Sequence, residues 1–320
     1  MLFLIPLLLI DFIYRIYRYF FPAPDIDPRG KSVLITGCDS GFGRALALDL
    51  DKQGFQIFAG VFNESNAKSL EEALSSSATV FRLDITDQND IDRAYEFIRE
   101  KTNSLHALVN NAGISTSGFI DWVTMESMRQ IMEVNFFGQV AITKKFLPLL
   151  ISKRQSRVVN LCSVAGFITA PIKGAYSASK HAFEAFSDCL RREMAPWELK
   201  VSIIEPGPMR TPIIQGHDKF MQTFWDNLSS EVRERWGEDY FRAQVKKLSD
   251  NFLYRNAEDP QKVVDALKHA VQNSAPETRY RPGWQSKFIF LPMSMMPTWV
   301  VDLVLQRGLS AGIDPAAVRQ

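Results

Sequence analysis

The sequence predicts an α/β fold in which a doubly wound parallel sheet carries helices on both faces. Short runs of β-branched and apolar residues alternate along the chain with longer segments in which apolar residues recur every three to four positions. The short runs have apolar side chains at consecutive positions, as strands covered on both faces do. The repeated order of strand, helix and strand therefore indicates a parallel sheet, and 320 residues suffice for one such domain.

Six segments are predicted as strands. In chain order they are KSVLIT (31–36), QIFAGVF (56–62), TVFRLD (79–84), LHALVN (105–110), RVVNLC (157–162) and VSIIEP (201–206). The predicted helices between them include GRALALDLDKQG (43–54), IDRAYEFIREK (91–101) and AFEAFSDCLRREM (182–194). Because doubly wound sheets bind ligands at the carboxyl ends of their strands, one binding edge is expected.

Four regions are predicted along the chain. Residues 31–285 form the catalytic domain, and its aromatic helix-like segments make a lid over a substrate at about 212–260. Residues 1–24 are predicted as a membrane anchor and residues 286–320 as an apolar tail associated with the membrane. The fold is thus expected to combine a sheet domain, a C-terminal helical lid and an N-terminal anchor.

The N-terminal anchor is too short in apolar residues to predict a clear membrane span. Its apolar run is interrupted by Asp11, Arg15 and Arg18, whereas a span needs about 20 apolar residues. Arginines and tyrosines after the run suit the headgroup region, so the pattern indicates attachment to a bilayer. No small-residue cleavage pattern follows, which argues against a removed signal. A buried N-terminal helix is the alternative.

Charge and cysteine content exclude two classes of function. Lys and Arg number 37 against 36 Asp and Glu, so there is no broad positive field to gather nucleic acid. Cys38, Cys162 and Cys189 form neither a disulfide framework nor a zinc-like spacing. We therefore expect no nucleic-acid partner and no metal site.

The first predicted strand runs into a glycine-rich loop, TGCDSGFG (36–43), at which a helix begins. Glycines there permit a tight turn, let the backbone approach a pyrophosphate and leave helix N–H groups pointing at the anion. A lone glycine loop could be an ordinary turn, but its position between strand and helix predicts a dinucleotide site. The predicted cofactor contacts in this loop are Gly37, Asp39, Ser40, Gly41, Phe42 and Gly43.

Charges near this loop favour NAD over NADP. Asp39 would repel a 2′-phosphate, and Glu64 lies near the end of the second strand, where an acidic residue can bind the adenosine ribose. Arg44 and Lys68 are nearby cations, but neither directly follows that strand. Asp84, at the end of the third strand, is either a contact of the adenine amino group or a helix cap.

The fourth strand ends in Asn110-Asn111-Ala112-Gly113, whose small and amide residues let a flat cofactor lie close to the backbone. Alone, this motif could be a turn. Together with the glycine loop it predicts further cofactor contacts at Asn110, Ala112 and Gly113.

Ser163, Tyr176 and Lys180 have the spacing of an alcohol dehydrogenase site. Ser163 closes the fifth strand, and Tyr176 and Lys180 lie one turn apart on one helical face. A phenol with a pKa near 10 is a weak base at neutral pH, and lowering that pKa by about 2–3 units takes about 3–4 kcal/mol. An ammonium at ~4 Å supplies about 4 kcal/mol. Tyr176 is therefore predicted as the acid/base and Ser163 as a hydrogen-bond donor to the substrate oxygen.

Asn135, in EVNFFG, falls in the middle of a predicted helix, although Asn is a poor helix former. A local bulge there would hold a water that links Lys180 to solvent for proton exchange. A buried asparagine satisfied by backbone groups is the alternative.

These residues resemble the short-chain dehydrogenase/reductase superfamily, with its Rossmann-type fold, over nearly all of residues 31–285. TGCDSGFG, LDITD, NNAG, EVNFFG, YSASK, EAFSDCLRREM and VSIIEPG look like its retinol and 17β/3α-hydroxysteroid dehydrogenase branch, with D-3-hydroxybutyrate dehydrogenases nearby. The resemblance implies NAD, a homo-oligomer, attachment to the endoplasmic-reticulum membrane and a catalytic tetrad of Asn135, Ser163, Tyr176 and Lys180. It implies cofactor contacts at Gly37, Ser40, Phe42, Asp84, Asn110, Pro206, Gly207 and Thr211.

The substrate candidates leave two alcohols open. A lipophilic alcohol, a retinoid or steroid reached from membrane lipid, suits the apolar candidates, which could equally be lid core: Phe119, Phe167, Ile172, Ile213, Phe220, Phe224 and Trp225. A hydroxybutyrate would need a partner for its carboxylate, and Lys173 could supply it. Bacterial hydroxybutyrate dehydrogenases carry a histidine where this chain has Ala165. The predicted substrate contacts are Ser163, Phe167, Ile172, Lys173 and Phe224.

Two sequons, at Asn63 and Asn227, bear on location. A glycan on Asn63 would obstruct the adenosine site, so the catalytic domain is predicted to face the cytosol from the endoplasmic-reticulum membrane, with a mitochondrial membrane as the alternative. Two alternative hypotheses lie outside the enzymes: a non-catalytic NAD-binding scaffold and an integral membrane structural protein.

Overall fold

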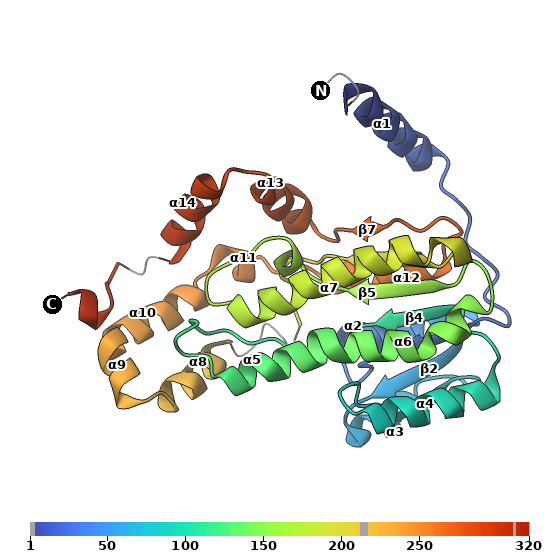
Figure 1. Cartoon of the computed structure of the whole chain (residues 1–320), viewed down its shortest axis with the longest axis horizontal. Helices are drawn as coiled ribbons and strands as arrows, with labels where there is room; N and C mark the ends of the chain where they lie inside the picture. Colours follow the sequence, from blue (N-terminus) through green and yellow to red (C-terminus); the bar gives the residue numbers. More distant parts are fainter. Residues whose placement is uncertain (1–3, 212–216, 310–311, 320) are drawn as a thin grey trace.

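A seven-stranded sheet forms the centre of the chain in the computed structural model, which describes residues 4–211, 217–309 and 312–319 (Figure 1). All strand pairs are parallel, in the order β3-β2-β1-β4-β5-β6-β7. The strands are β1 (Ser32–Ile35), β2 (Gln56–Val61), β3 (Thr79–Arg82), β4 (Ala107–Asn110), β5 (Arg157–Leu161), β6 (Lys200–Ile204) and β7 (Arg279–Tyr280). The strand order reverses between β1 and β4, which creates a ligand crevice at their carboxyl ends.

The six predicted strands are confirmed, and the sequence reading missed the seventh. β7 is only two residues long and pairs with β6 through Ile203 and Ile204. A run this short has no periodicity of its own, and its strand conformation depends on the neighbouring strand.

Helices cover both faces of the sheet, as predicted, because side chains of each strand alternate between two cores. Val33 and Ile35 of β1 join one cluster with α2, α3 and α12, whereas Leu34 joins the other with α4, α6 and α7. These helices are α2 (Gly41–Gln53), α3 (Ala67–Glu71), α4 (Gln88–Lys101), α6 (Gly138–Ile151), α7 (Gly174–Glu193) and α12 (Gln261–Gln272). α5 (Met125–Met132) runs into α6 through a π-helical segment, η2 (Glu133–Phe137).

A third, separate core holds the lid together. Trp122 and Trp225 are buried in it with Tyr240 and Phe241, and Phe119 packs against them. The lid helices are α8 (His217–Asp226), α9 (Ser230–Trp236), α10 (Glu238–Ser249) and α11 (Phe252–Arg255). The predicted lid is thus helical, and its aromatic side chains pack on one another and on Phe119 and Trp122 of the segment after β4.

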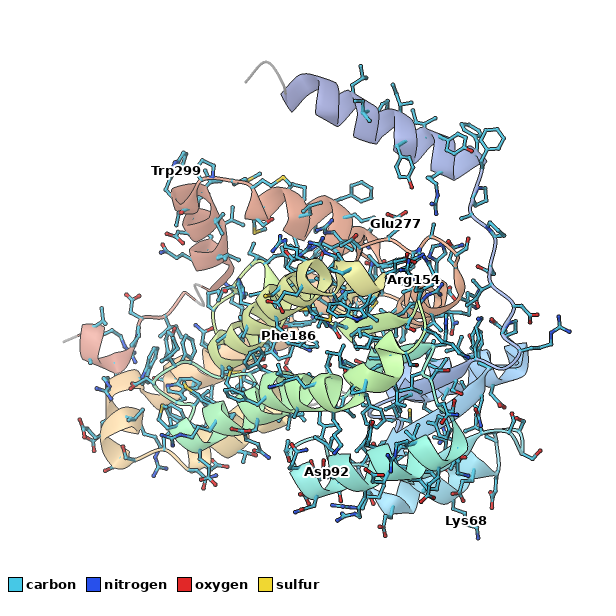
Figure 2. All side chains as sticks on the ribbon, turned by 45° about the vertical axis from the view of Figure 1, so that its right-hand side comes forward. Lys68, Asp92, Arg154, Phe186, Glu277 and Trp299 are labelled. Atoms are coloured by element: carbon cyan, nitrogen blue, oxygen red, sulfur yellow. The ribbon has the colours of Figure 1, made fainter. Side chains whose placement is uncertain are left out.

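The two ends of the chain extend beyond the sheet domain. α1 (Leu4–Phe20) projects from it, and α13 (Leu291–Ser294) and α14 (Thr298–Leu309) follow the sheet at the other end of the chain (Figure 1). Trp299 of α14 points away from the body and is 70% exposed (Figure 2). Among the residues that the structure describes, no helix combines the length and apolar character needed to cross a bilayer.

Candidate active site

The glycine loop and the turn after β4 are packed so tightly that their small residues are required. A Cβ on Gly37, which has φ +69°, would lie 2.8 Å from Cα of Ala112. A Cβ on Gly43 would lie 2.5 Å from the carbonyl oxygen of Gly37. These contacts leave bare backbone at the start of α2, which is the cradle that a pyrophosphate requires.

Asn111 binds the two loops together, a role that the sequence reading missed. Its Nδ2 donates to the carbonyl oxygens of Thr36 at 2.8 Å and Gly37 at 3.0 Å. In return, Oγ1 of Thr36 accepts from the backbone N–H groups of Asn111 at 3.1 Å and Ala112 at 3.0 Å. The second asparagine of the Asn110-Asn111-Ala112-Gly113 motif was the sequence signal from which this role could have been predicted.

The side chain of the neighbouring Asn110 lies in the core beneath the predicted cofactor motif. Its side chain is fully buried, and Nδ2 donates to Thr143 Oγ1 and to Asn160 Oδ1, each at 2.8 Å. The amide therefore ties β4 to β5 and α6, which leaves the backbone of Asn110 as the part available to a cofactor.

Asp39 links the glycine loop to the end of β2. Its carboxylate accepts from the backbone N–H groups of Phe62 at 2.9 Å and Asn63 at 2.8 Å. Glu64 is exposed in the short helix that follows, η1 (Glu64–Asn66). The negative charge nearest the expected ribose site is thus Asp39, held by backbone donors.

The other predicted contacts of the adenosine half lie around this cradle. Ser40 precedes α2 as its N-terminal residue without making a side-chain cap bond, and Gly41 has φ +59° with open space beside it. Phe42 packs partly against the core beneath the sheet. Asp84 accepts from the backbone N–H of Thr86 at 2.9 Å in the turn before α4, whose cap is Asp87 and not Asp84.

Tyr176 and Lys180 project from the first two turns of α7 toward the end of β5. Nζ of Lys180 lies 5.9 Å from the ring centroid of Tyr176 and donates to the carbonyl oxygen of Leu161 at 2.9 Å. The side chain of Ser163, two residues after the end of β5, lowers the pKa of Tyr176 through a hydrogen bond. The predicted serine, tyrosine and lysine are therefore brought together in one place.

Asn135 reaches the same place from the π-helical segment. Its Oδ1 accepts from the backbone N–H of Ile114 at 2.9 Å, and its Nδ2 donates to the Ile114 carbonyl at 2.9 Å and to Ser179 Oγ at 3.1 Å. A Cβ on Gly113 would lie 3.3 Å from Oδ1 of Asn135 and 3.8 Å from Nζ of Lys180. The predicted local bulge is present, and the Asn135 side chain is buried and bonded to backbone groups, as the alternative expected. The bare backbone of Gly113 faces the tetrad.

Burial works against both charged forms of the catalytic pair. Burial raises the pKa of Tyr176 well above its usual value, although the hydrogen bond with Ser163 opposes the shift. Burial also lowers the pKa of Lys180. Each charge therefore depends on nearby opposite charge for its stability.

The predicted substrate contacts on this side form a tight turn before α7. Ile172 adopts φ +64°, which is unusual for a β-branched residue, and its carbonyl accepts from Gly118 N at 2.9 Å. Nζ of Lys173 donates to Ser117 Oγ at 2.6 Å and lies 5.9 Å from the Tyr176 ring centroid. Burial lowers the pKa of Lys173 to about 7.

The aromatic candidates divide between the site and the lid core. Phe167 follows η3 (Val164–Gly166), and its ring lies under the guanidinium of Arg281, with Cζ 5.7 Å from the centroid. Phe224 is half-buried, 3.6 Å from the position that a Cβ on Gly118 would occupy. Phe119 and Trp225 belong to the lid core. Ile213 and the side chain of Phe220 lie outside the described residues.

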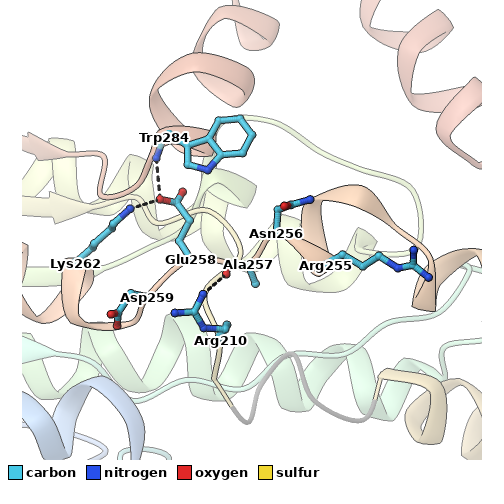
Figure 3. Close-up of a pocket in the computed structure, with 8 residues that line it drawn as sticks. All are labelled: Arg210, Arg255, Asn256, Ala257, Glu258, Asp259, Lys262 and Trp284. Atoms are coloured by element: carbon cyan, nitrogen blue, oxygen red, sulfur yellow. Dashed lines mark hydrogen bonds and ion pairs between the residues drawn. The ribbon is translucent and has the colours of Figure 1, made fainter.

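Pro206, Gly207 and Thr211 follow β6 at the same edge. The Pro206 carbonyl accepts from Val164 N at 3.0 Å, and Thr211 is buried. Beyond Thr211 a hollow of about 430 Å³ opens, lined by charged and polar groups (Figure 3): Arg210, Arg255, Asn256, Ala257, Glu258, Asp259, Lys262 and Trp284. Its polar lining does not suit a lipophilic alcohol, and no tetrad residue contributes to it.

Comparison with known proteins agrees with this geometry. Residues 31–222 match the family model described as short chain dehydrogenase. Retinol dehydrogenase 16 of Rattus norvegicus is 40% identical over 277 residues, which cover 85% of this chain and 86% of that protein. 17-beta-hydroxysteroid dehydrogenase type 6 of Bos taurus is 38% identical over 282 residues, covering 87% of this chain and 88% of that protein.

A solved structure extends the agreement to three dimensions. A short-chain dehydrogenase from Streptomyces avermitilis superposes with a TM-score of 0.68 at 26% identity, covering 88% of this chain and 96% of that one. The chain therefore belongs to the short-chain dehydrogenase/reductase family of oxidoreductases, in the branch that contains the retinol and 17β-hydroxysteroid dehydrogenases.

Proposed function

We propose that this chain transfers a hydride between NAD(H) and the alcohol or carbonyl group of a lipophilic substrate, a retinol or a hydroxysteroid. The observation that carries the proposal is the convergence of Ser163, Tyr176 and Lys180 beside the bare backbone of Gly113. A bound nicotinamide dinucleotide supplies the hydride acceptor and, when oxidised, a positive charge. The close-packed glycines at 37, 43 and 113 fit such a cofactor, because each leaves backbone where a side chain would intrude.

In alcohol oxidation, Tyr176 accepts the substrate hydroxyl proton at its phenol oxygen, and Ser163 donates a hydrogen bond to the same substrate oxygen. Lys180 lowers the free energy of the phenolate. Nζ of Lys180 lies 5.9 Å from the centre of the Tyr176 ring. A unit charge at about that distance, with an effective dielectric of ~20, contributes about 3 kcal/mol, or about 2 pKa units. That contribution opposes the burial that raises the pKa of Tyr176.

Asn135 fixes the position of Lys180 relative to the segment that follows β4. Its amide bridges the backbone of Ile114 and the hydroxyl of Ser179, the residue before Lys180. All three of these bonds fix the strand end after β4 relative to α7. The water that links Lys180 to solvent at the π-helical segment stays a prediction.

The preference for NAD over NADP rests on Asp39. Its carboxylate lies against the N–H groups at the end of β2, where the adenosine ribose of a bound dinucleotide would lie. A 2′-phosphate there would face a negative charge at short range, and that repulsion disfavours NADP. Replacing Asp39 by Asn should narrow the ratio of NAD to NADP affinity, which a binding titration with both cofactors measures.

The lipophilic substrate is supported by the relatives and by the lid. Relatives at about 40% identity are named for retinol and for 17β-hydroxysteroid. Phe224 of lid helix α8 approaches Gly118, whose N–H binds the Ile172 carbonyl, and apolar walls of this kind bind apolar ligands. Exposed apolar residues of α1, among them Ile10, Phe12 and Ile13, support attachment to membrane lipid, from which such a substrate can be drawn.

The location that we propose is the cytosolic face of the endoplasmic-reticulum membrane. Asn63 lies beside Asp39, so a glycan on this sequon would obstruct the adenosine site. Endoglycosidase treatment should therefore leave the gel mobility of the membrane-bound protein unchanged, and a shift contradicts a cytosolic catalytic domain.

D-3-hydroxybutyrate is a second candidate substrate because of Lys173. Its ammonium lies next to Tyr176, and its hydrogen-bond acceptors on Ser115, Thr116 and Ser117 are all neutral oxygens. A substrate carboxylate would supply the missing negative charge. Ala165, two residues after Ser163, offers no second hydrogen-bond donor to that carboxylate.

The experiment that tests the function is NADH formation by membranes that contain the protein. All-trans-retinol, androstane-type 3α- and 17β-alcohols, and D-3-hydroxybutyrate are offered in parallel, with NADP as a second cofactor arm. We expect turnover of at least one lipophilic alcohol with NAD. Turnover of hydroxybutyrate alone would select the second candidate, and no turnover of any alcohol would contradict the proposal.

A further inference from the structure

The face of α7 that carries the catalytic pair continues for one more turn to a buried carboxylate. Tyr176, Lys180 and Glu184 follow one another at intervals of four residues, so all three lie on one helical face. Glu184 is 8% exposed, and a Cβ on Gly166 would meet its Cγ at 2.7 Å. The carboxylate is therefore held beside Gly166 in η3, the short helix that follows Ser163.

Arg279 anchors Glu184 in that position. Its guanidinium reaches Oε2 of Glu184 at 2.9 Å, Oδ1 of Asp188 at 3.1 Å and Oε1 of Glu205 at 2.8 Å. Arg281 completes the group by pairing with Oε2 of Glu205 at 2.7 Å. This charged cluster of two arginines and three carboxylates joins α7 to β6 and β7.

One oxygen of Glu184 is left without a donor. Oε1 is buried and accepts no hydrogen bond from the described residues. The nearby thiol of Cys162 donates instead to the carbonyl oxygen of Lys180 at 3.4 Å. A buried carboxylate oxygen without a donor is costly, and such an exception calls for an explanation.

We propose that Glu184, anchored by Arg279, is a positioning residue that keeps the ammonium of Lys180 charged beside Tyr176. This inference rests on the proposed function, because it assigns a role within the same tyrosine and lysine pair. No direct ion pair joins the two groups, so the carboxylate acts on Lys180 through space across one helical turn. Buried charges interact strongly because water screens them little.

The charges around Lys180 agree with this role. Burial lowers the pKa of Lys180, and Cys162 and Glu184 act in the opposite direction. Burial raises the pKa of the Cys162 thiol well above its usual value, so this thiol is neutral near pH 7. Tyr254 and Lys173 are the other titratable groups beside Tyr176, and both stay in place in the variants below. Glu184 is thus the carboxylate available to stabilise the ammonium.

The inference predicts a particular change in the pH profile. Tyr176 and Lys180 titrate as a coupled pair. In the form that is active in oxidation, Tyr176 has lost its proton and Lys180 keeps its own. Removing the negative charge of Glu184 makes both protons easier to lose, so both pH limits of activity move to lower pH. Removing this charge also disfavours the singly protonated form in which the proton is on Lys180, so the plateau of kcat/KM between the two limits falls.

The test is the pH dependence of kcat/KM for NAD-dependent oxidation by the full-length protein, with whichever alcohol of the panel it turns over. For Glu184→Gln we expect both limits to move down by about one unit and the plateau to fall about tenfold. Glu184→Asp, which keeps the charge, should retain the wild-type limits. In the Gln variant Arg279 still forms ion pairs with Asp188 and Glu205, which favours folding. Glu184→Leu is a second uncharged variant, and its pH limits should shift by the same amount.

Asp188→Asn is the matched control. It removes another carboxylate from Arg279 but lies a further turn from Lys180, so its pH limits should equal those of the wild type. A fall in the plateau of both Glu184 variants without movement of the limits, in protein whose melting temperature shows it folded, overturns the inference. A wild-type protein without any turnover instead contradicts the proposed function itself.

Discussion

The sheet edge and the lid form two halves of the same site, yet they are held together by different means. At the sheet edge, Asn111, Asn135 and Lys180 each bind backbone carbonyls of strand ends, at 2.8 to 2.9 Å. The lid residues Trp225 and Phe241 pack on each other and on Trp122, which belongs to the segment between β4 and α5. The chemistry therefore depends on hydrogen bonds to the ends of the strands, whereas the substrate side depends on an aromatic core that joins the lid to the segment after β4.

The largest effect that separates the two halves is expected from Trp225→Ala. Truncating a buried tryptophan costs about 3–5 kcal/mol, and here the loss falls within the lid core. We expect the KM for a lipophilic alcohol to rise more than about tenfold while the Kd for NAD stays within about twofold, as steady-state kinetics and a binding titration measure.

Phe252→Ala is the control for that variant, because Phe252 lies on lid helix α11 but is 62% exposed. It should leave both constants near the wild type. Equal losses of NAD and substrate affinity in Trp225→Ala would show that the halves are not independent.

The next effect concerns stability at the far end of the sheet, away from the chemistry. His106 is held by the Val271 carbonyl at 2.9 Å, and burial lowers its pKa to about 4. The unfolded chain binds a proton near pH 6.5 and the folded one only near pH 4, so stability is present above pH 6.5 and is lost as the pH falls toward 4. The loss approaches about 3 kcal/mol.

Urea unfolding between pH 7 and pH 4 measures this loss. His106→Gln should flatten the pH dependence of the free energy of unfolding without changing kcat. His181→Gln, at an exposed histidine, is the matched control and should leave that pH dependence unchanged. An unchanged slope in His106→Gln contradicts the assignment.

A smaller effect is expected at the cofactor cradle. A Cβ at residue 43 would lie 2.4 Å from Nδ2 of Asn111, and overpacking of this kind costs about 1–3 kcal/mol. Gly43→Ala should therefore weaken NAD binding by about 5- to 150-fold. Gly308→Ala, where nothing lies within 4 Å, is the control in the same titration.

The same comparison explains what the sequence could predict. Six strands and the positions of Tyr176, Lys180 and Ser163 follow from local patterns, because strand periodicity and helical spacing are properties of short segments. The bulge at Asn135 was predicted for the same reason, since an asparagine within a helical pattern is locally unfavourable. All of these residues lie at or beside the sheet edge.

The parts that sequence reasoning missed depend on contacts between distant segments. Arg279 meets Glu184 across 95 residues of chain, and no local pattern pairs them. Phe119 and Trp225 were left open between substrate contact and lid core, because an aromatic residue has the same pattern in either place; the structure puts both in the lid core. β7 was missed because two residues carry no periodicity.

The most direct test of the account is Tyr176→Phe, which removes one oxygen from the site and leaves the ring in place. We measure NAD binding by titration and NADH formation with the alcohol that the wild type oxidises best. The account predicts that kcat/KM falls by about 10²- to 10⁴-fold or more while the Kd for NAD stays within about threefold. Turnover close to that of the wild type would contradict the assignment of Tyr176 as the acid/base, and a chain in which neither form turns over would be a scaffold that binds the cofactor without using it.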